Sequence, residues 1–370
     1  MKILLITYHF PPLPGPGSLR PARMVKYLRS CGHDVFVVTQ ADCAPKSWEA
    51  VILRVRDISH NCNRRGWRGM QWLALRLAIE ALNRAWIYAS IYSWWKQAVL
   101  KRAETIMANA HPQAIIATYP PVETLEIGLH LSRKYNLPLV ADFRDGLLFE
   151  AIESKSLRRF ACVRKAYAAI EQRIASEAVA LTTVSEPLSH YFRETYDKSC
   201  VATVPNGFDP DETQLKLPDI DLEPGCFHVV HSGRFSLSDA GCTIIPLVQA
   251  LDSLLADRPE LAQKLRLHLL GELSRQEIKM LAGLAQRGVA NLHGPVNRPR
   301  ALALQRSADL LLLVTAPNRL SVATTKIFEY LQARRPILAL TPRSFAAEII
   351  EKCGCGWVVS PLAVSAIRLI

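Results

Sequence analysis

Two short polar segments in the second half of the sequence carry residue types that bind phosphate. In Ser232-Gly233-Arg234, the glycine permits close backbone approach to a ligand and the arginine offers a cation for a diphosphate. The second segment supplies hydroxyl and ammonium groups from Ser321, Thr324, Thr325 and Lys326. A helix expected to begin near Thr324 would add free N–H groups and a positive dipole end. Both segments predict a phosphate site, beside which Glu329 would accept hydrogen bonds from ribose hydroxyls.

The first half of the sequence has a charged cluster directly after an apolar run. Asp142-Phe143-Arg144-Asp145 follows residues 139–141, and two carboxylates bracketing an arginine suit a polar site. One carboxylate can hold or deprotonate an acceptor hydroxyl while the other orients the arginine. A surface salt bridge or a helix cap explains the same residues equally well. Gly15 and Gly17 permit close approach to a ligand or form only a tight turn, and their spacing is not the dinucleotide fingerprint GxGxxG.

Apolar runs typical of buried strands alternate with helical segments along the chain. Strands are expected at 2–8, 35–38, 114–117, 139–141, 179–184 and 201–204, and then at 227–231, 265–270, 290–293, 310–314, 337–340 and 357–359. Helices are expected between them: one capped by Ser18 with Pro21 in its first turn, one over 122–135, one over about 156–176, and one capped by Ser185. Such alternation is typical of parallel sheets covered on both faces.

The two series of strands predict an α/β protein of two Rossmann-like, doubly wound parallel-sheet domains. We expect the first domain at 1–209, a polar linker at 210–225 and the second domain at 226–370. In open sheets of this type, ligands bind beyond the carboxyl ends of the strands. The charged and polar segments described above follow expected strands, so they lie where a ligand should bind.

The composition is that of a globular protein with a basic surface. Apolar residues make up 49% and charged residues 21%, and the net charge is +12. This charge suits phosphorylated ligands, anionic lipid or nucleic acid, or serves solubility alone, but no nucleic-acid recognition motif appears. The sequence shows no signal peptide and no run of about 18 apolar residues, and its nine scattered cysteines are typical of a reduced, cytoplasmic protein.

Residues 60–105 combine aromatic and basic side chains at helical spacing. Five of the seven tryptophans lie here, at Trp67, Trp72, Trp86, Trp94 and Trp95. The accompanying basic residues are Arg64, Arg65, Arg68, Arg76, Arg84, Lys96, Lys101 and Arg102. One interpretation is an amphipathic surface that sits on an anionic membrane. The alternative is that the tryptophans pack these helices against the first sheet.

Taken in order, the motifs resemble those of the retaining glycosyltransferases of GT-B fold, family 4, over essentially the whole chain. In the first half they are Phe10-Pro11-Pro12, Gly15-Pro16-Gly17-Ser18, Arg20, Gly32-His33-Asp34-Val35, Asp142-Phe143-Arg144-Asp145 and Asn206-Gly207-Phe208-Asp209. In the second half they are Ser232-Gly233-Arg234, Lys326-Ile327-Phe328-Glu329-Tyr330-Leu331 and Arg335-Pro336-Ile337-Leu338.

The resemblance implies that the two domains face each other and that the second binds a nucleotide-sugar donor. Glu329 matches the second glutamate of the family's Glu-x7-Glu signature, on the donor ribose, whereas Ser321 stands in place of the first. No lysine or arginine occurs in Phe235–Gly241, so Arg234 and Lys326 would hold the diphosphate. The helix with which the family usually crosses back onto the first domain is not evident after the strand at 357–359.

These inferences assign a role to each candidate residue. The catalytic residues are expected to be Asp142, Arg234 and Lys326. The donor-binding residues are expected to be Gly15, Gly17, Gly233, Arg234, Ser321, Thr324, Thr325, Lys326 and Glu329. Arg144 and Asp145 are expected on the acceptor side, and no metal or other cofactor is called for.

The predicted activity is transfer of a hexose, with retention, from a nucleotide sugar to a sugar or lipid-linked saccharide acceptor. The setting we expect is bacterial surface polysaccharide assembly, in the cytoplasm or peripherally at the inner face of the plasma membrane. Two alternatives stay open: a nucleotide-sugar epimerase of the same fold, and a non-catalytic protein that binds sugar nucleotides. Nucleic acid is not an expected partner.

Overall fold

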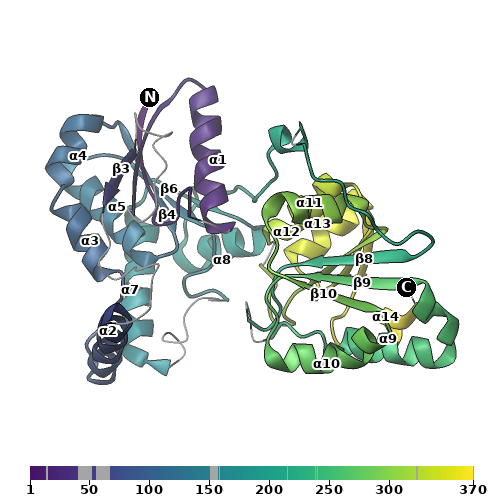
Figure 1. Ribbon diagram of the computed structural model, residues 1–370. Coiled ribbons are helices and arrows are strands. Elements are labelled where there is room, and N and C mark those ends of the chain that lie inside the picture. Colours follow the sequence, from purple (N-terminus) through teal and green to yellow (C-terminus); the bar gives the residue numbers. More distant parts are fainter. Residues whose placement is uncertain are drawn as a thin grey trace. The chain divides into compact units, whose positions relative to one another are not determined.

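The computed structural model divides the chain into two compact units, Met1–Val204 and Pro205–Ile370 (Figure 1). It describes residues 1–13, 16–40, 52–55, 67–150, 157, 159–214, 216–237, 239, 241–321 and 324–369. Each unit is a parallel sheet with helices packed against it, and together they confirm the predicted α/β class with two doubly wound domains.

The first unit is built on a parallel sheet with strand order β3-β2-β1-β4-β5-β6-β7. Its strands are β1 (Lys2–Ile6), β2 (Asp34–Gln40), β3 (Ile52–Val55), β4 (Ala114–Tyr119), β5 (Leu139–Phe143), β6 (Ala180–Thr183) and β7 (Val201–Thr203). Leu4 of β1 lies opposite Phe36 on one side and Ile115 on the other. The winding reverses between β1 and β4, and the carboxyl ends at such a reversal are where these sheets bind ligands.

The helices of the first unit are α1 (Pro16–Ser30), α2 (Trp67–Arg84), α3 (Ser93–Leu100), α4 (Ala103–Ala110), α5 (Val122–Tyr135), α7 (Ala161–Glu177) and α8 (Glu186–Tyr196). Helices cover both faces of the sheet, so alternate side chains of β1 are buried on opposite faces. Leu5 packs in a cluster with Val25 of α1, whereas Leu4 packs with Trp95 of α3 and Leu125 of α5. Successive side chains of a strand point to opposite faces, so one apolar run requires two helical layers.

The second unit repeats this design with strand order β10-β9-β8-β11-β12-β13. Its strands are β8 (Phe227–Ser232), β9 (Leu265–Leu270), β10 (Ala290–Gly294), β11 (Leu310–Val314), β12 (Ile337–Leu340) and β13 (Gly356–Val359). Its helices are α9 (Ile245–Asp257), α10 (Arg275–Gln286), α11 (Arg298–Ser307), α12 (Thr325–Ala333), α13 (Phe345–Cys353) and α14 (Val364–Leu369), with short 3-10 turns at Pro210–Gln214 and Pro259–Gln263. The winding reverses between β8 and β11, which places the carboxyl end of β8 at the expected ligand edge.

The structure departs from the expected elements at three places. Ser18 lies inside α1, which begins at Pro16, so the expected cap at Ser18 is wrong. Strand β3 was not expected, because its four residues are too short to give a periodic signal. Helix α14 follows β13 and packs against α9 within the second unit.

The aromatic segment 60–105 divides between core and surface. Trp95 is fully buried in the main cluster of the first unit, as the packing interpretation expects. Trp86 and Trp94 are 71% and 58% exposed. Arg64 and Arg65 lie outside the described residues, and the side chains of Trp67 and Arg68 are likewise not described. No helix in the described part of the chain is both long enough and apolar enough to span a bilayer.

Candidate functional site

Gly233 and Lys326 meet at the carboxyl end of β8. Gly233 has φ +117, a conformation that L side chains rarely adopt. A Cβ at this position would lie 2.6 Å from Lys326 Nζ, so the lysine side chain occupies the space that only glycine leaves free. Two residues that are 93 positions apart in the sequence thus form one surface at the predicted phosphate site.

Helix α12 begins beside this glycine, as predicted from the sequence. Thr324 is its N-cap residue, with extended backbone, but the Thr324 hydroxyl makes no capping hydrogen bond. That hydroxyl is buried and has no hydrogen-bond partner among the described residues. Thr325 and Lys326 are the first two helical residues, where backbone N–H groups lack intrahelical acceptors. Hydroxyl, N–H groups and ammonium therefore gather at the positive end of the helix dipole.

The Lys326 ammonium is a partly buried cation to which no described residue offers a hydrogen-bond acceptor. Burial lowers the pKa of Lys326, and Glu329 and Cys242 only partly offset this effect. The neighbouring His231 ring is fully buried, stacks on Phe235 with ring centroids 4.1 Å apart, and has no partner for its Nε2. Burial, and then the charge of Lys326, hold the pKa of His231 well below its usual value. An anion placed here would stabilise the charged form of Lys326.

Glu329 lies one turn into α12 and is held by an arginine that the sequence did not single out. Arg298 Nη1 donates to Glu329 Oε1, and Arg298 Nη2 donates to Glu212 Oε2 at 2.9 Å. Burial lowers the pKa of Arg298, but the two carboxylates outweigh it and raise the pKa. Each carboxylate oxygen has two lone pairs, so Glu329 keeps acceptor capacity for a ribose hydroxyl.

The remaining donor-side residues have partners within the second unit. Arg234 is half-exposed and pairs with Glu272 at 2.7 Å, so a diphosphate would have to compete for its guanidinium. Ser321 is buried. Ser232 donates its N–H to the Tyr330 hydroxyl at 3.1 Å, and Gln305 Nε2 donates to Ser232 Oγ at 2.9 Å. Tyr330 and Gln305 therefore position the loop after β8, a role that no sequence pattern indicated.

In the first unit, Asp142 forms a closed network with Arg20. Arg20 Nε and Nη2 donate to the two Asp142 oxygens at 3.0 and 2.6 Å. Thr118 and Thr182 donate to the same oxygens at 2.8 and 2.7 Å. Burial raises the pKa of Asp142, but Arg20 and the two threonines outweigh it and lower the pKa. Because Asp142 is fully buried, its oxygens act on a ligand only through the groups that they hold.

Arg144 and Asp145 lie closer to the surface of the first unit. Arg144 Nε pairs with Asp145 Oδ2 at 3.2 Å, and both side chains are partly exposed. A Cβ at Gly17 would lie 2.7 Å from Arg144 Nη1, so the start of α1 and the end of β5 converge. Gly15 lies outside the described residues. The structure thus brings Gly17, Arg144 and Asp145 together, beside the buried Arg20–Asp142 pair.

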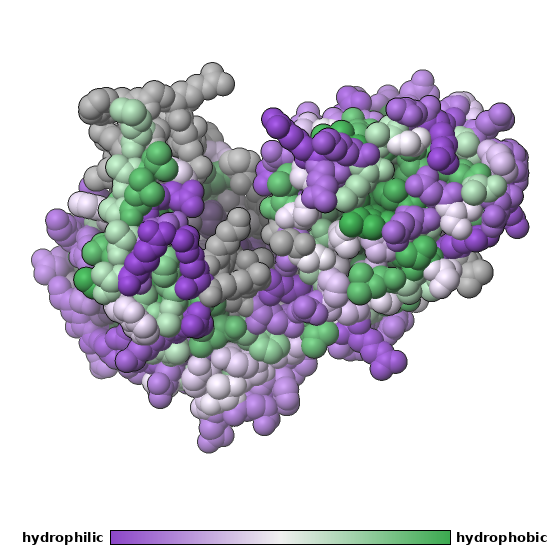
Figure 2. Space-filling view, turned by 90° about the horizontal axis from the view of Figure 1, so that it is seen from below, coloured by the Kyte–Doolittle hydropathy of each residue, from purple (hydrophilic) through white to green (hydrophobic). Residues whose placement is uncertain are grey.

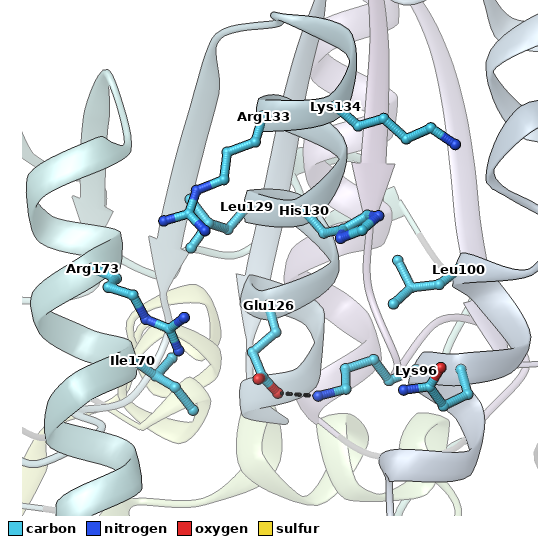
Figure 3. A pocket seen from close by; sticks show the side chains of 10 residues that line it. Lys96, Leu100, Glu126, Leu129, His130, Arg133, Lys134, Ile170 and Arg173 are labelled. Atoms are coloured by element: carbon cyan, nitrogen blue, oxygen red, sulfur yellow. Dashed lines mark hydrogen bonds and ion pairs between the residues drawn. The ribbon is translucent and has the colours of Figure 1, made fainter.

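A groove of about 500 Å³ on the outer helices of the first unit is a weaker candidate for an anion (Figure 3). It runs over α5 between α3 and α7 and is lined by Lys96, Arg133 and Lys134. These cations pair with Glu126, Glu177 and Glu104 respectively. Arg173 also lines the groove, and its Nε donates to the Ala169 carbonyl, so most but not all of the cations here are paired with carboxylates. In the described part of the chain, no three potential metal ligands gather at one place.

Comparison with known proteins decides the class. Residues 18–207, just over half of the chain, match the family described as Glycosyl transferase 4-like domain. The chain belongs to this family. It is therefore a glycosyltransferase, in agreement with the sequence prediction. No curated protein sequence matches the chain.

Solved glycosyltransferase structures share the fold of this glycosyltransferase. WaaG, a glycosyltransferase involved in lipopolysaccharide biosynthesis, is 17% identical with a TM-score of 0.61, covering 100% of this chain and 89% of WaaG. Sucrose-phosphate synthase from Thermosynechococcus elongatus is 17% identical with a TM-score of 0.65, covering 99% and 88%. Anabaena HepE, in complex with UDP and glucose, is 17% identical with a TM-score of 0.57, covering 100% and 88%. At these identities the likeness establishes the GT-B fold.

Proposed function

We propose that the second unit of this glycosyltransferase binds a nucleotide-sugar donor at Gly233, Lys326 and the start of α12. The observation that carries the proposal is the partly buried Lys326 ammonium, which lies against a glycine at the end of β8 and has no hydrogen-bond acceptor among the described residues. A diphosphate supplies the missing anion, and the N–H groups of α12 bind its oxygens. Glu329 then accepts hydrogen bonds from the ribose. The HepE structure, which contains UDP and glucose, has the same fold and supports this choice.

The proposed reaction is transfer of the sugar to an acceptor hydroxyl with retention at the anomeric carbon. As the bond to the sugar breaks, negative charge develops on the departing diphosphate. Lys326, Arg234 and the start of α12 meet that charge, which is the principal way in which such a site lowers the barrier. Retention rests on the resemblance to the retaining family, and the anomeric configuration of the product, determined by NMR, tests it.

On the acceptor side we assign Arg144 and Asp145 to contacts with the substrate and Asp142 to positioning Arg20. Asp142 has four hydrogen bonds and no exposed oxygen, whereas Arg144 and Asp145 are partly exposed. The acceptor we propose is a sugar on a lipid carrier, in surface polysaccharide assembly at an anionic membrane. The basic, tryptophan-rich segment 60–105 would hold the protein there, since each basic side chain near such a surface contributes about 1 kcal/mol.

A thermal-shift screen with nucleotide diphosphates and nucleotide sugars tests donor binding. A ligand at about 100 times its Kd stabilises the folded state by about 2.7 kcal/mol, which raises Tm clearly. The selected donor is then incubated with and without sugar acceptors, and the products are separated. Transfer that requires an acceptor supports the proposal. Conversion of the donor sugar without an acceptor identifies an epimerase, and binding without turnover identifies a non-catalytic protein.

Vesicle co-sedimentation tests the membrane setting. Wild type should bind vesicles that contain anionic lipid, and binding should decrease with salt because the attraction is electrostatic. The triple variant Arg64→Glu, Arg65→Glu and Arg68→Glu should stay in the supernatant. Equal recovery of both proteins on anionic vesicles contradicts a role for these arginines.

A further inference from the structure

A cavity of about 300 Å³ lies along α2 in the first unit. Five aromatic side chains line it: Trp72, Tyr88, Tyr92, Tyr119 and Tyr167. Tyr119 is the last residue of β4, so this cavity, here called the α2 pocket, reaches the carboxyl end of a strand beside the reversal between β1 and β4. Its volume is at the lower end of the range for small-molecule sites and suits one sugar unit rather than a long oligosaccharide.

The walls of the α2 pocket are fixed by aromatic packing from the core. Tyr8, which follows β1, packs edge-on against Tyr92 of the pocket and against Trp95 of the core, with ring centroids 4.9 and 5.1 Å apart. Tyr88 and Tyr167 meet edge-on at 5.9 Å. Rings that are already held in place lose little conformational freedom when a ligand binds, so the site is preorganised.

The polar groups of the α2 pocket are few. Among the described residues, the charged ones that line it are Arg76, whose guanidinium lies 4.8 Å from the Trp72 ring, and Glu80, which also pairs with Arg84 and Arg159. The buried Tyr88 hydroxyl has no hydrogen-bond partner in the described part of the chain. A neutral, hydroxyl-rich ligand fits this set better than a diphosphate does. The C–H faces of a sugar ring pack on aromatic rings, and its hydroxyls pair with phenol, carboxylate and guanidinium groups.

The other side of α2 is apolar and exposed. Met70, Leu73 and Leu77 are 60%, 54% and 59% exposed, and their spacing of three and four residues puts them on one face of the helix. Figure 2 shows hydrophobic residues gathered along this helix, where the lower end of the first unit faces the viewer. From Met70 to Leu77 this face extends about 10 Å along α2, enough to contact part of an extended lipid chain.

We propose that the α2 pocket binds the saccharide of a lipid-linked acceptor and that the exposed face of α2 contacts its lipid. This inference rests on the proposed glycosyltransfer and names the acceptor site of that reaction. One helix presents aromatic and polar groups on one side and bare apolar side chains on the other. An amphiphilic ligand matches both sides together, whereas a water-soluble sugar uses only the pocket. Arg84, an exposed basic residue in the last turn of α2 that pairs with Glu80, complements the phosphate that joins sugar to lipid.

The test measures binding of alkyl glycosides directly, so it needs no knowledge of the donor. The probes are methyl and octyl β-glycosides of glucose, galactose and N-acetylglucosamine, below their micelle concentrations, observed by saturation-transfer NMR. At least one octyl glycoside should bind roughly tenfold tighter than its methyl counterpart, because part of the alkyl chain is removed from water. Transfer of saturation should reach both the sugar protons and the alkyl chain.

Two variants separate the pocket from the apolar face. Ala89 lines the pocket, and Ala89→Trp should fill it and abolish sugar contacts with both probes, whereas Ala108→Trp on the exposed side of α4 should change neither. The double variant Leu73→Ser and Leu77→Ser should bind methyl glycosides normally and lose the advantage of the octyl chain. Circular dichroism confirms that each variant is folded.

Several results overturn the inference. Unchanged glycoside binding by folded Ala89→Trp excludes the pocket, and so does failure of every glycoside to bind wild type. If the Leu73 and Leu77 double variant turns a dimer into a monomer on size-exclusion chromatography and binds octyl glycosides normally, the apolar face is a contact with a second copy. UDP is added to the same samples. Stabilisation by UDP without glycoside binding removes this inference alone, whereas glycoside binding without any nucleotide binding removes the proposed donor site.

Discussion

At the carboxyl end of β5, the buried Asp142 carboxylate accepts four hydrogen bonds, whereas at the start of α12 the Lys326 ammonium donates none to a described residue. Both groups lie at the ligand edge of a parallel sheet, and both are charged. The first has all its partners in the protein, including the bidentate Arg20. In our proposal, the second receives an anion beside Gly233.

We infer from this contrast that a charged residue after a strand marks a ligand site when its side chain has no partner among the described residues. A buried ion pair with complete hydrogen bonding holds the structure in one arrangement, and removal of one partner leaves an uncompensated charge. A cation that is partly removed from water, with no acceptor among the described residues, is destabilised, and a bound anion would offset this cost. Asp142 should therefore matter most for stability, and Lys326 most for donor binding and turnover.

The largest effect is expected for Asp142→Asn. The amide keeps the volume but leaves the buried Arg20 guanidinium without a carboxylate, so the free energy of unfolding should fall by about 3–5 kcal/mol. Urea denaturation measures it. The matched control is Asp145→Asn, which removes a partly exposed pair with Arg144 and should cost at most about 1 kcal/mol. A stable Asp142→Asn variant without transferase activity would give Asp142 a direct catalytic role. It would contradict the division into a stabilising Asp142 and a donor-binding Lys326.

In contrast to Asp142→Asn, Lys326→Ala should lower turnover more than stability. Loss of the cation that meets the developing charge should lower kcat about 10²–10³-fold, the range for removal of one group that stabilises the departing charge. The Tm should stay close to that of wild type or rise, because a partly buried ammonium that has no acceptor among the described residues is removed. Lys279→Ala, at an exposed position of α10, is the control for loss of charge alone. Wild-type rates in the Lys326→Ala variant would place the phosphate site elsewhere.

Glu329→Gln should weaken donor binding by about 1.5–3 kcal/mol, the range for a hydrogen bond to a charged group. Calorimetric titration with UDP and with 2′-deoxy-UDP and 3′-deoxy-UDP separates direct from indirect effects. If Glu329 accepts from the ribose, the variant should lose little further affinity when the relevant hydroxyl is absent. A penalty that is equal for all three ligands would mean that Glu329 acts only by holding Arg298. Glu348→Gln, on the exposed part of α13, should change nothing.

Local sequence patterns predicted the helices and strands more accurately than the contacts between residues that are distant in the sequence. Helix α5 has the predicted bounds, 122–135, and α12 begins after Thr324, because amphipathic spacing and cap residues are local signals. The buried strands followed from continuous apolar runs. The pairing of Arg20 with Asp142 joins residues 122 positions apart, and no periodicity encodes it.

The same limit applies around the donor site. Gly233 and Lys326 were each predicted from residue type, but their contact depends on the adjacency of β8 and β11, which only the sheet order supplies. Arg298 was missed because an arginine after an N-cap asparagine is ordinary in a helix. Its hold on Glu329 arises from the packing of α11 beside α12. The roles assigned to these residues stay predictions until the variants above are measured.

Three histidines in the second unit form a hydrogen-bonded row, which differs from both the fully paired Asp142 carboxylate and the Lys326 ammonium. His228 Nδ1 lies 2.9 Å from His268 Nε2, and His268 Nδ1 lies 3.0 Å from His293 Nε2, across β8, β9 and β10. Each contact pairs one donor with one acceptor, and a neutral His268 can supply both through one protonated and one unprotonated ring nitrogen. Burial, and then the neighbouring rings, lower the pKa of His268 to about 4.

This row should make the second unit sensitive to acid, with the smallest of the expected effects. In the unfolded chain His268 takes up a proton near pH 6.5, whereas in the folded chain it stays neutral to about pH 4. Its contribution to stability is therefore complete above pH 6.5 and is lost as the pH falls from 6.5 towards 4. The loss should be about 1–2 kcal/mol, since solvent near the partly exposed His293 reduces the full effect.

Urea denaturation between pH 7.5 and pH 4.5 measures this loss of stability. The variant is His268→Gln, and the control is His190→Gln, at an exposed position of α8. The decline should be smaller in His268→Gln than in wild type and unchanged in His190→Gln; equal slopes in all three proteins would show that the row tolerates a proton.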